Sequence, residues 1–105
     1  MQFIETSAFT KQITAFLSDE EYMQLQAALI IQPDLGDLIP GSGGLRKLRW
    51  RIAGKGKRGG ARTIYYWDSP SETIYMMFIY KKSELADLTQ QQLKALRRMV
   101  EEYLR

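Results

Sequence analysis

The chain of 105 residues contains neither cysteine nor histidine. Without cysteine there are no disulfides, no thiolate zinc sites and no thiol nucleophiles. Without histidine the chain lacks the usual transition-metal ligand and the side chain that most often moves protons near pH 7. We therefore expect a protein that uses no metal and no cofactor.

Long hydrophobic runs are also missing. No apolar stretch approaches the roughly 18 residues that a membrane-spanning helix needs, and the start MQFIETSAFTKQ does not resemble a signal peptide. The sequence is 45% hydrophobic and 11% aromatic, which is typical of a globular chain. These features predict one cytoplasmic domain over residues 1–105 with no membrane partner.

Basic residues are scarce in the first part of the chain. Residues 1–44 carry one base and six acids, for a net charge of −5, whereas residues 45–105 carry fourteen bases and six acids, for a net charge of +8. The stretch LRKLRWRIAGKGKRGGAR (45–62) holds eight of these bases and no acid. Such asymmetry indicates a surface that faces a polyanion, although it also serves solubility.

Periodicity predicts an α+β fold in the order β-α-α-β-β-β-α, a small antiparallel sheet with an N-terminal helical hairpin and a C-terminal helix. A short strand is expected around 2–5, and helices follow over 9–17 and from the capping box that begins at Ser18. Turn residues fill 32–44, strands are expected over 48–52, 62–67 and 73–80, and a second capping box at Thr89 opens the last helix.

The basic stretch divides into a strand and a loop. Lys47, Arg49 and Arg51 alternate with Leu48, Trp50 and Ile52, so they are expected on one face, about 7 Å apart. The following AGKGKRGG lacks the phosphate-loop pattern and is not followed by a helix, so a cationic loop that grips nucleic-acid backbone fits better. A solvated sheet face is the simpler alternative for the strand.

Aromatic side chains follow the charge in 65–67, 75 and 80. Most of them must belong to the core because of the strand periodicity, but one or two on the basic face could stack on bases.

The strings GGLRKLRW, GKGKRGGARTIYYW and IYKKSELADLT, together with the order of elements, resemble the HigB-like branch of the RelE/ParE toxin superfamily. The resemblance implies the toxin of a type II toxin–antitoxin system. Such a toxin is a ribosome-dependent, metal-independent mRNA endoribonuclease that enters the 30S A site and inhibits translation. The 2′-hydroxyl attacks the adjacent phosphate. The implied partners are the ribosome with its mRNA and a HigA-like antitoxin with a helix-turn-helix domain, through which alone the toxin would meet operator DNA.

Matching positions imply catalytic roles for Lys47, Arg49, Arg62 and Lys82. The expected RNA- or ribosome-binding residues are Arg46, Arg51, Lys55, Lys57, Arg58 and Lys81. The tyrosine that takes part in proton transfer in RelE falls on Leu88 here, so the general base stays open, with Tyr66 and Tyr80 as candidates for proton transfer or stacking. Two alternatives remain: a basic RNA- or DNA-binding module that does not cut, and a regulatory partner protein.

Overall fold

A computed structural model describes residues 1–50, 60–85 and 87–104. In chain order the elements are β1 (Gln2–Glu5), α1 (Ser7–Phe16), α2 (Asp19–Ile31), β2 (Asp37–Leu38), β3 (Leu45–Trp50), β4 (Ala61–Asp68), β5 (Thr73–Lys81) and α3 (Gln90–Tyr103). The predicted α+β fold and its order are confirmed. The structure contains one element that the sequence did not predict, the two-residue strand β2, which lies inside the stretch expected to consist only of turns.

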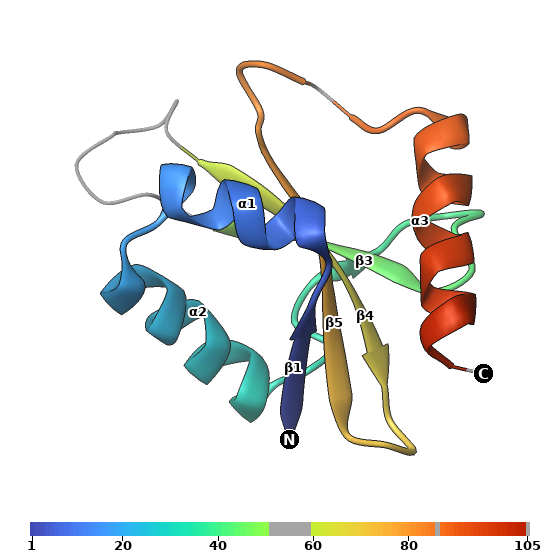
Figure 1. The fold of residues 1–105 in the computed structure, drawn as a ribbon, viewed down its shortest axis with the longest axis horizontal. Coiled ribbons are helices and arrows are strands. Elements are labelled where there is room, and N and C mark those ends of the chain that lie inside the picture. The colour runs from blue at the N-terminus through green and yellow to red at the C-terminus, as the bar shows by residue number, and fades with distance from the viewer. Residues whose placement is uncertain (51–59, 86, 105) are drawn as a thin grey trace.

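The sheet has the strand order β1-β5-β4-β3-β2 (Figure 1). Strands β2 to β5 are antiparallel, as predicted, but β1 pairs with β5 in parallel. The first strand thus lies beside the last one, and β3 and β4, which carry Lys47, Arg49 and Arg62, lie next to each other. No helix in the described part of the chain is long and apolar enough to cross a membrane.

Capping side chains set the helix starts where the sequence predicted them. Ser18 and Glu21 form a reciprocal capping box at α2, with N···O distances of 2.9 and 3.1 Å. Thr89 and Gln92 form the same arrangement at α3. At α1 the buried Thr6 hydroxyl accepts from Phe9 and donates to the carbonyl of Met77 on β5 at 2.7 Å. This cap therefore also ties α1 to the sheet.

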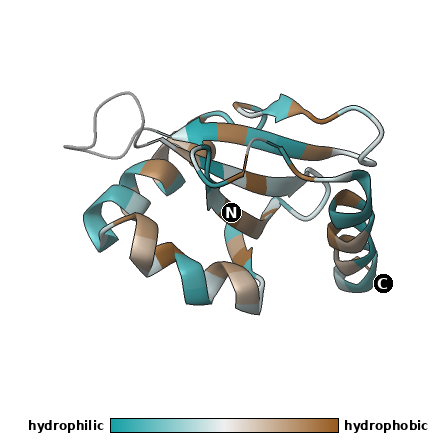
Figure 2. Ribbon diagram, turned by 90° about the horizontal axis from the view of Figure 1, so that it is seen from above, coloured by the Kyte–Doolittle hydropathy of each residue, from teal (hydrophilic) through white to brown (hydrophobic). Residues whose placement is uncertain are grey.

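Helices cover the sheet from two sides, α1 and α2 from one and α3 from the other (Figure 1). Leu48 and Tyr65 pack with the residues of α1 and α2, and Leu45 and Ile64 pack with those of α3. Hydrophobic and hydrophilic segments alternate along the strands (Figure 2), as a sheet with side chains pointing to both layers requires. We call these two sides the α1–α2 face and the α3 face.

The expected helical hairpin is present as two consecutive helices that diverge from a two-residue connection (Figure 1). Phe9 of α1 meets Tyr22 of α2 with ring centroids 5.8 Å apart. Tyr22 also donates to the Glu5 carboxylate at 2.6 Å, which anchors α2 to β1.

A β-bulge interrupts the pairing of β4 with β5. Ile64 pairs with Phe78 and Tyr65 pairs with Met76, so Met77 is the extra residue. Met77 and Phe78, although consecutive, both pack on the α3 face. The side chains that follow are therefore shifted by one position, and Tyr80 lies on the α3 face rather than on the α1–α2 face.

The turn before β3 contacts α3 closely. Gly43 has a φ of +72°, and a Cβ atom there would come within 2.4 Å of Arg97 Nε. The Arg97 guanidinium itself lies 5.5 Å from the centroid of the Tyr66 ring on β4. A side chain at position 43 would therefore have to displace Arg97 from this contact between loop, helix and strand.

Gly43→Ala should lower the free energy of unfolding by about 2–4 kcal/mol, because strained backbone adds to a steric clash. Gly41→Ala is the matched control, since Gly41 has a φ of +71° but a Cβ atom added there would meet nothing within 4 Å; about 1 kcal/mol is expected there. Chemical denaturation measures both, and equal losses would contradict the role of the Arg97 contact.

Candidate active site

One residue from each of three neighbouring strands forms a row across the α3 face. Arg49 on β3 pairs with Arg62 on β4, and Arg62 pairs with Tyr80 on β5. Adjacent strands are about 5 Å apart, so these three side chains start within roughly 10 Å of one another. The row brings two guanidinium groups and a phenol together from positions far apart in the sequence.

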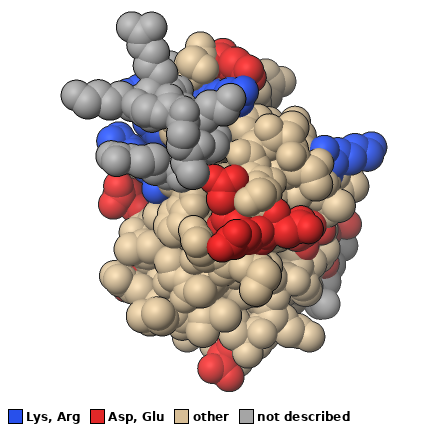
Figure 3. All heavy atoms as spheres, turned by 90° about the vertical axis from the view of Figure 1, so that its left-hand side faces the viewer, with Lys and Arg blue, Asp and Glu red and all other residues tan. Residues whose placement is uncertain are grey.

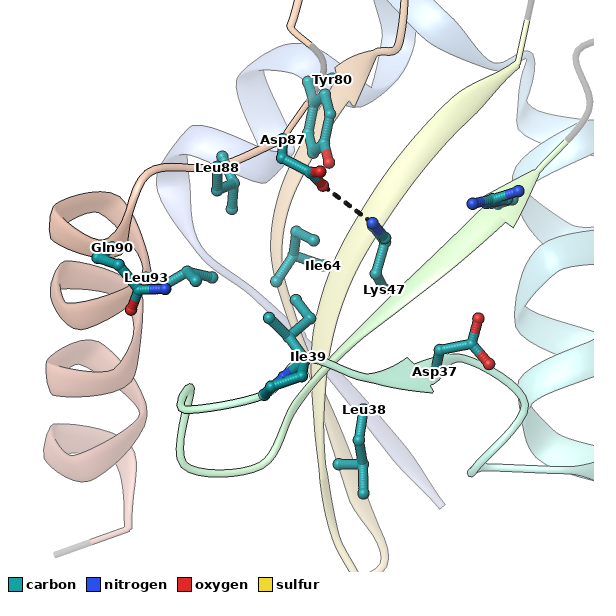
Figure 4. A pocket seen from close by; sticks show the side chains of 12 residues that line it. Asp37, Leu38, Ile39, Lys47, Ile64, Tyr80, Asp87, Leu88, Gln90 and Leu93 are labelled. Atoms are coloured by element: carbon teal, nitrogen blue, oxygen red, sulfur yellow. Dashed lines mark hydrogen bonds and ion pairs between the residues drawn. The ribbon is translucent and has the colours of Figure 1, made fainter.

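Lys47 lies on the same face, two residues before Arg49, and its ammonium group donates to the Asp87 carboxylate at 2.9 Å (Figure 4). Both residues line a cleft of about 450 Å3 between β3, the β5–α3 connection and α3, together with Arg49, Tyr80 and the apolar Ile64, Leu88 and Leu93. The cleft is therefore cationic and polar on the strand side and apolar toward α3.

Asp87 is exposed, and its pKa is lowered from the ordinary value. The first cause is the hydrogen bond from Lys47, followed by the charges of Lys47, Arg49 and Arg62. The carboxylate is therefore deprotonated at neutral pH, and it accepts a hydrogen bond where an incoming anion would meet the same cations.

Tyr80 is 5% exposed, and no hydrogen-bond partner for its hydroxyl is present among the described residues. Burial and the Asp87 carboxylate raise its pKa, while Arg62 opposes that shift. The phenol is consequently protonated near neutral pH and has a free proton to donate.

Arg62 is 8% exposed, which is unusual for an arginine. Its Nη1 atom lies 3.3 Å from the place where a Cβ of Gly60 would be, so the glycine leaves room for the guanidinium. Burial restricts the side chain to few rotamers, and so its donors are held in fixed directions.

The family described as "RelE toxin of RelE / RelB toxin-antitoxin system" matches residues 6–105 of the chain. This chain belongs to the RelE toxin family. RelE-family toxins are endoribonucleases that partner with an antitoxin and the ribosome. The fold is similar to that of an E. coli toxin RelE mutant solved in the free state, with 13% identity, a TM-score of 0.55, and coverage of 81% of this chain and 86% of that one.

In this RelE-family chain the other residues that the sequence predicted to bind or cut RNA do not gather in the cleft. Arg46 points to the α1–α2 side, where its Nη1 donates to the carbonyl oxygen of Gly36 at 2.8 Å. Lys81 lies over the Phe16 ring of α1, 5.7 Å from its centroid. Lys82 is exposed in the turn after β5 and is not among the described residues that line the cleft.

Tyr66 contacts Arg97 and Tyr75, and it lies four residues from Arg62, about 13 Å along β4. Of the two candidate tyrosines, the structure brings only Tyr80 into the row with the arginines. The predicted RNA-binding residues Arg51, Lys55, Lys57 and Arg58 lie outside the described residues.

Sequence reasoning treated the cationic face as uniform, and that interpretation was incomplete, because Asp87 lies against Lys47 there. The sequence feature that could have revealed this acid is its place directly before Leu88, the position compared with the family tyrosine, and shortly after Lys81 and Lys82. Strand or helix periodicity cannot predict which way a side chain points in a connecting segment. Only the structure therefore shows that Asp87 pairs with Lys47, forty positions earlier.

Lys47→Met should raise the pKa of Asp87, because it removes the largest causes of the lowered value. A smaller rise is expected for Arg49→Met, whose charge contributes less. Carboxyl 13C NMR titration measures both. The ion pair should persist at neutral pH and disappear as pH falls through the lowered pKa, and an unchanged Asp87 pKa in Lys47→Met would contradict the pairing.

Proposed function

We propose that this RelE-family toxin is a ribosome-dependent mRNA endoribonuclease of the HigB-like branch. It would act as a single domain in the cytoplasm and cut translated mRNA in the 30S A site, thereby inhibiting translation. The observation that supports this most is the row of Arg49, Arg62 and Tyr80 across the α3 face, because it brings two cations and a phenol together beside the cleft that Lys47, Arg49 and Tyr80 line.

Cleavage of RNA by its own 2′-hydroxyl needs three things from a protein. The 2′-oxygen forms a bond to the adjacent phosphorus as it loses its proton, and the bond from phosphorus to the 5′-oxygen breaks as that oxygen gains a proton. The products are a 2′,3′-cyclic phosphate and a free 5′-hydroxyl. In between, the phosphorane carries extra negative charge, which preorganised donors stabilise.

Arg49 and Arg62 are suited to the phosphorane. A guanidinium presents several N–H donors in one plane and matches two phosphate oxygens at once. Arg62 is buried and Arg49 exposed, so we assign Arg62 to the transition state and Arg49 to the entering backbone.

The proton transfers fall to groups beside this pair. Tyr80 keeps its proton at neutral pH and its hydroxyl has no partner among the described residues, so it is the candidate to protonate the leaving 5′-oxygen, although its raised pKa makes it a weak acid. Lys47 and Lys82 are the other candidates for moving protons. Asp87 is a deprotonated carboxylate of the cleft, but its lowered pKa and its bond to Lys47 make it a weak base. It is a candidate base for the 2′-hydroxyl only after an incoming phosphate has displaced it from Lys47.

The ribosome supplies what such a site lacks. A cleft without histidine gains most from a messenger that is already held in the geometry for attack, because positioning alone can provide several kcal/mol. Basic residues outside the cleft, including Arg51, Lys55, Lys57 and Arg58, are proposed to contact ribosomal RNA. Activity should therefore decrease at higher salt.

The proposed partner in neutralisation is a HigA-like antitoxin with a helix-turn-helix domain, through which alone the toxin meets operator DNA. The alternative is a basic module that binds RNA without cutting it. Mapping new 5′ ends in translated messengers separates the two, because breaks within codons on incubation with the protein require an enzyme.

Arg62→Ala should reduce the cleavage rate on translating ribosomes by about 100-fold or more, since one preorganised donor is lost. Lys11→Ala is the matched control, because it removes one positive charge from an exposed site on α1. Mapped 5′ ends and growth arrest are the readouts. Wild-type cleavage in folded Arg62→Ala would overturn this catalytic assignment.

Asp87→Asn should strengthen binding of an uncleavable RNA about two- to fivefold at low salt, because an exposed ion pair no longer competes for Lys47. The same change should slow cleavage if the carboxylate accepts the 2′-hydroxyl proton. Glu84→Gln in the same connection is exposed and provides the control for net charge. Equal RNA affinities and equal rates for the two variants would exclude both roles of Asp87.

A further inference from the structure

A second hollow lies beside α3, further along the helix than the cleft. It has a volume of about 570 Å3 and lies between the turn that joins β2 to β3 and residues 93–101 of α3. Three bases and one acid line it, and the full lining is Gly41, Ser42, Gly43, Leu93, Lys94, Arg97, Arg98 and Glu101. We call this space the α3 hollow.

The cleft and the α3 hollow are consecutive parts of one groove. Leu93 lines both spaces, and Pro40 at the border of the cleft is followed directly by Gly41 of the hollow. Figure 4 shows Leu93 pointing from α3 into the space between the helix and the strands. Because a helix rises about 1.5 Å per residue, Arg97 lies about 10 Å further along α3 than Gln90, which lines the cleft. A chain molecule bound in the cleft can therefore continue into the hollow.

Arg97 is held in a fixed position in the hollow. Its guanidinium lies 5.5 Å from the centroid of the Tyr66 ring, and Gly43 packs against its Nε atom. Its Nη1 atom is buried and has no hydrogen-bond partner among the described residues. Glu101 Oε1 is 4.0 Å away, beyond hydrogen-bonding distance, and the Glu101 side chain is 60% exposed. A buried donor without an acceptor is costly, and an anion in the hollow would supply the acceptor.

Lys94 and Arg98 add two more charges at the same place. Both are exposed, and because they are one helical turn apart they lie on the same side of α3. Neither forms an ion pair with another described residue. Like charges at this spacing destabilise a helix, so the pair does not serve the helix itself. A bound anion would relieve the repulsion.

The chemistry of the hollow suits a phosphate, and its connection to the cleft favours an RNA strand. A guanidinium matches two phosphate oxygens at once, and a lysine adds a mobile charge. A free phosphate would occupy one space only, whereas a single strand carries phosphates along its whole length and follows a basic groove. The other side of the molecule would repel the strand. Residues 12–45 contain five acids and no base, and Figure 3 shows acidic side chains gathered there above a broad uncharged area.

We propose that the α3 hollow binds a backbone phosphate of the messenger strand that continues out of the cleft. This inference rests on the proposed function in taking RNA to be the ligand of the cleft. The bound phosphate lies a few nucleotides from the bond that is cut, so Lys94, Arg97 and Arg98 do not touch the reacting atoms. They are binding residues that hold the strand in register with the row of Arg49, Arg62 and Tyr80.

The test measures how the full chain binds single-stranded RNA that carries 2′-O-methyl groups and cannot be cut. Lys94→Gln and Arg98→Gln should each weaken binding of an RNA of about ten nucleotides roughly three- to tenfold at low salt, and each should lower the slope of log affinity against log salt by about one. Lys11→Gln is the matched control, because it removes one exposed charge from α1. It should bind within twofold of wild type. Circular dichroism verifies the fold of each variant.

A shorter RNA and neutral linkages locate the contact. An RNA of about three nucleotides fits the cleft alone, so wild type, Lys94→Gln and Arg98→Gln should bind it equally. In the longer RNA, one methylphosphonate linkage outside the cleft should weaken binding by wild type and leave binding by Lys94→Gln unchanged. That pattern would show that the lost charge and the lost phosphate belong to one contact.

Three results would overturn the proposal. In the first, Lys94→Gln and Arg98→Gln both bind the longer RNA within twofold of wild type. In the second, inorganic pyrophosphate binds wild type as tightly as the longer RNA does, which would make the hollow a site for free anions. In the third, the variants lose affinity only for ribosomes without a messenger, which would assign the hollow to ribosomal RNA.

The proposed enzyme function fails in a different way. A wild-type chain that produces no new 5′ ends on translating ribosomes would overturn that function. The same chain could still show the length and charge dependence of RNA binding, which would leave the assignment of the hollow in place. Conversely, cleavage by wild type together with unchanged binding by Lys94→Gln and Arg98→Gln would overturn the hollow alone.

Discussion

The bulge at Met77 is the constraint on which the candidate site depends. One extra residue in β5 reverses which face each later side chain takes, and so Tyr80 joins Arg62 instead of the core beneath α1. The same shift turns Lys81 toward Phe16. Without it, the two arginines would have no phenol beside them. The bulge interrupts the ladder between β4 and β5, and at the extra residue the Thr6 hydroxyl donates to the carbonyl of Met77.

Much of the fold follows from local signals. Both capping boxes, the alternation of Leu48 and Trp50 with Lys47 and Arg49, and the apolar run of β5 were sufficient to predict the elements and the strand face of two site residues. The bulge was hidden because YMMFIY is apolar at every position that could have marked a change of face. Arg46 was grouped with the RNA-binding bases by its position in the sequence, although the pleat directs it to Gly36. Asp87 was missed because its partner is distant in the sequence.

The arrangement of charge gives this small chain two unlike surfaces. Three bases of β3 and β4, Lys47, Arg49 and Arg62, lie on the α3 face, while the acid-rich first part of the chain forms the helices of the other face. The sheet between them separates the two surfaces by a packed core. The two faces of the sheet thus present surfaces of opposite sign. Changes on one surface leave the other largely unaffected, as expected for sites with no shared contacts.

The ion pair between Lys47 and Asp87 means that the cleft carries its own competitor. Any phosphate that binds Lys47 must displace the Asp87 carboxylate. Because this carboxylate belongs to the same chain, it binds Lys47 without the loss of translational entropy that a free phosphate undergoes. Stray RNA and nucleotides, which meet the cleft one contact at a time, are discriminated against. Under the proposed function, a messenger that the decoding centre presents, already oriented and joined by many simultaneous contacts, is not. The intramolecular anion would then act as an affinity threshold that favours the assembled substrate over the abundant loose polyanions of a cell.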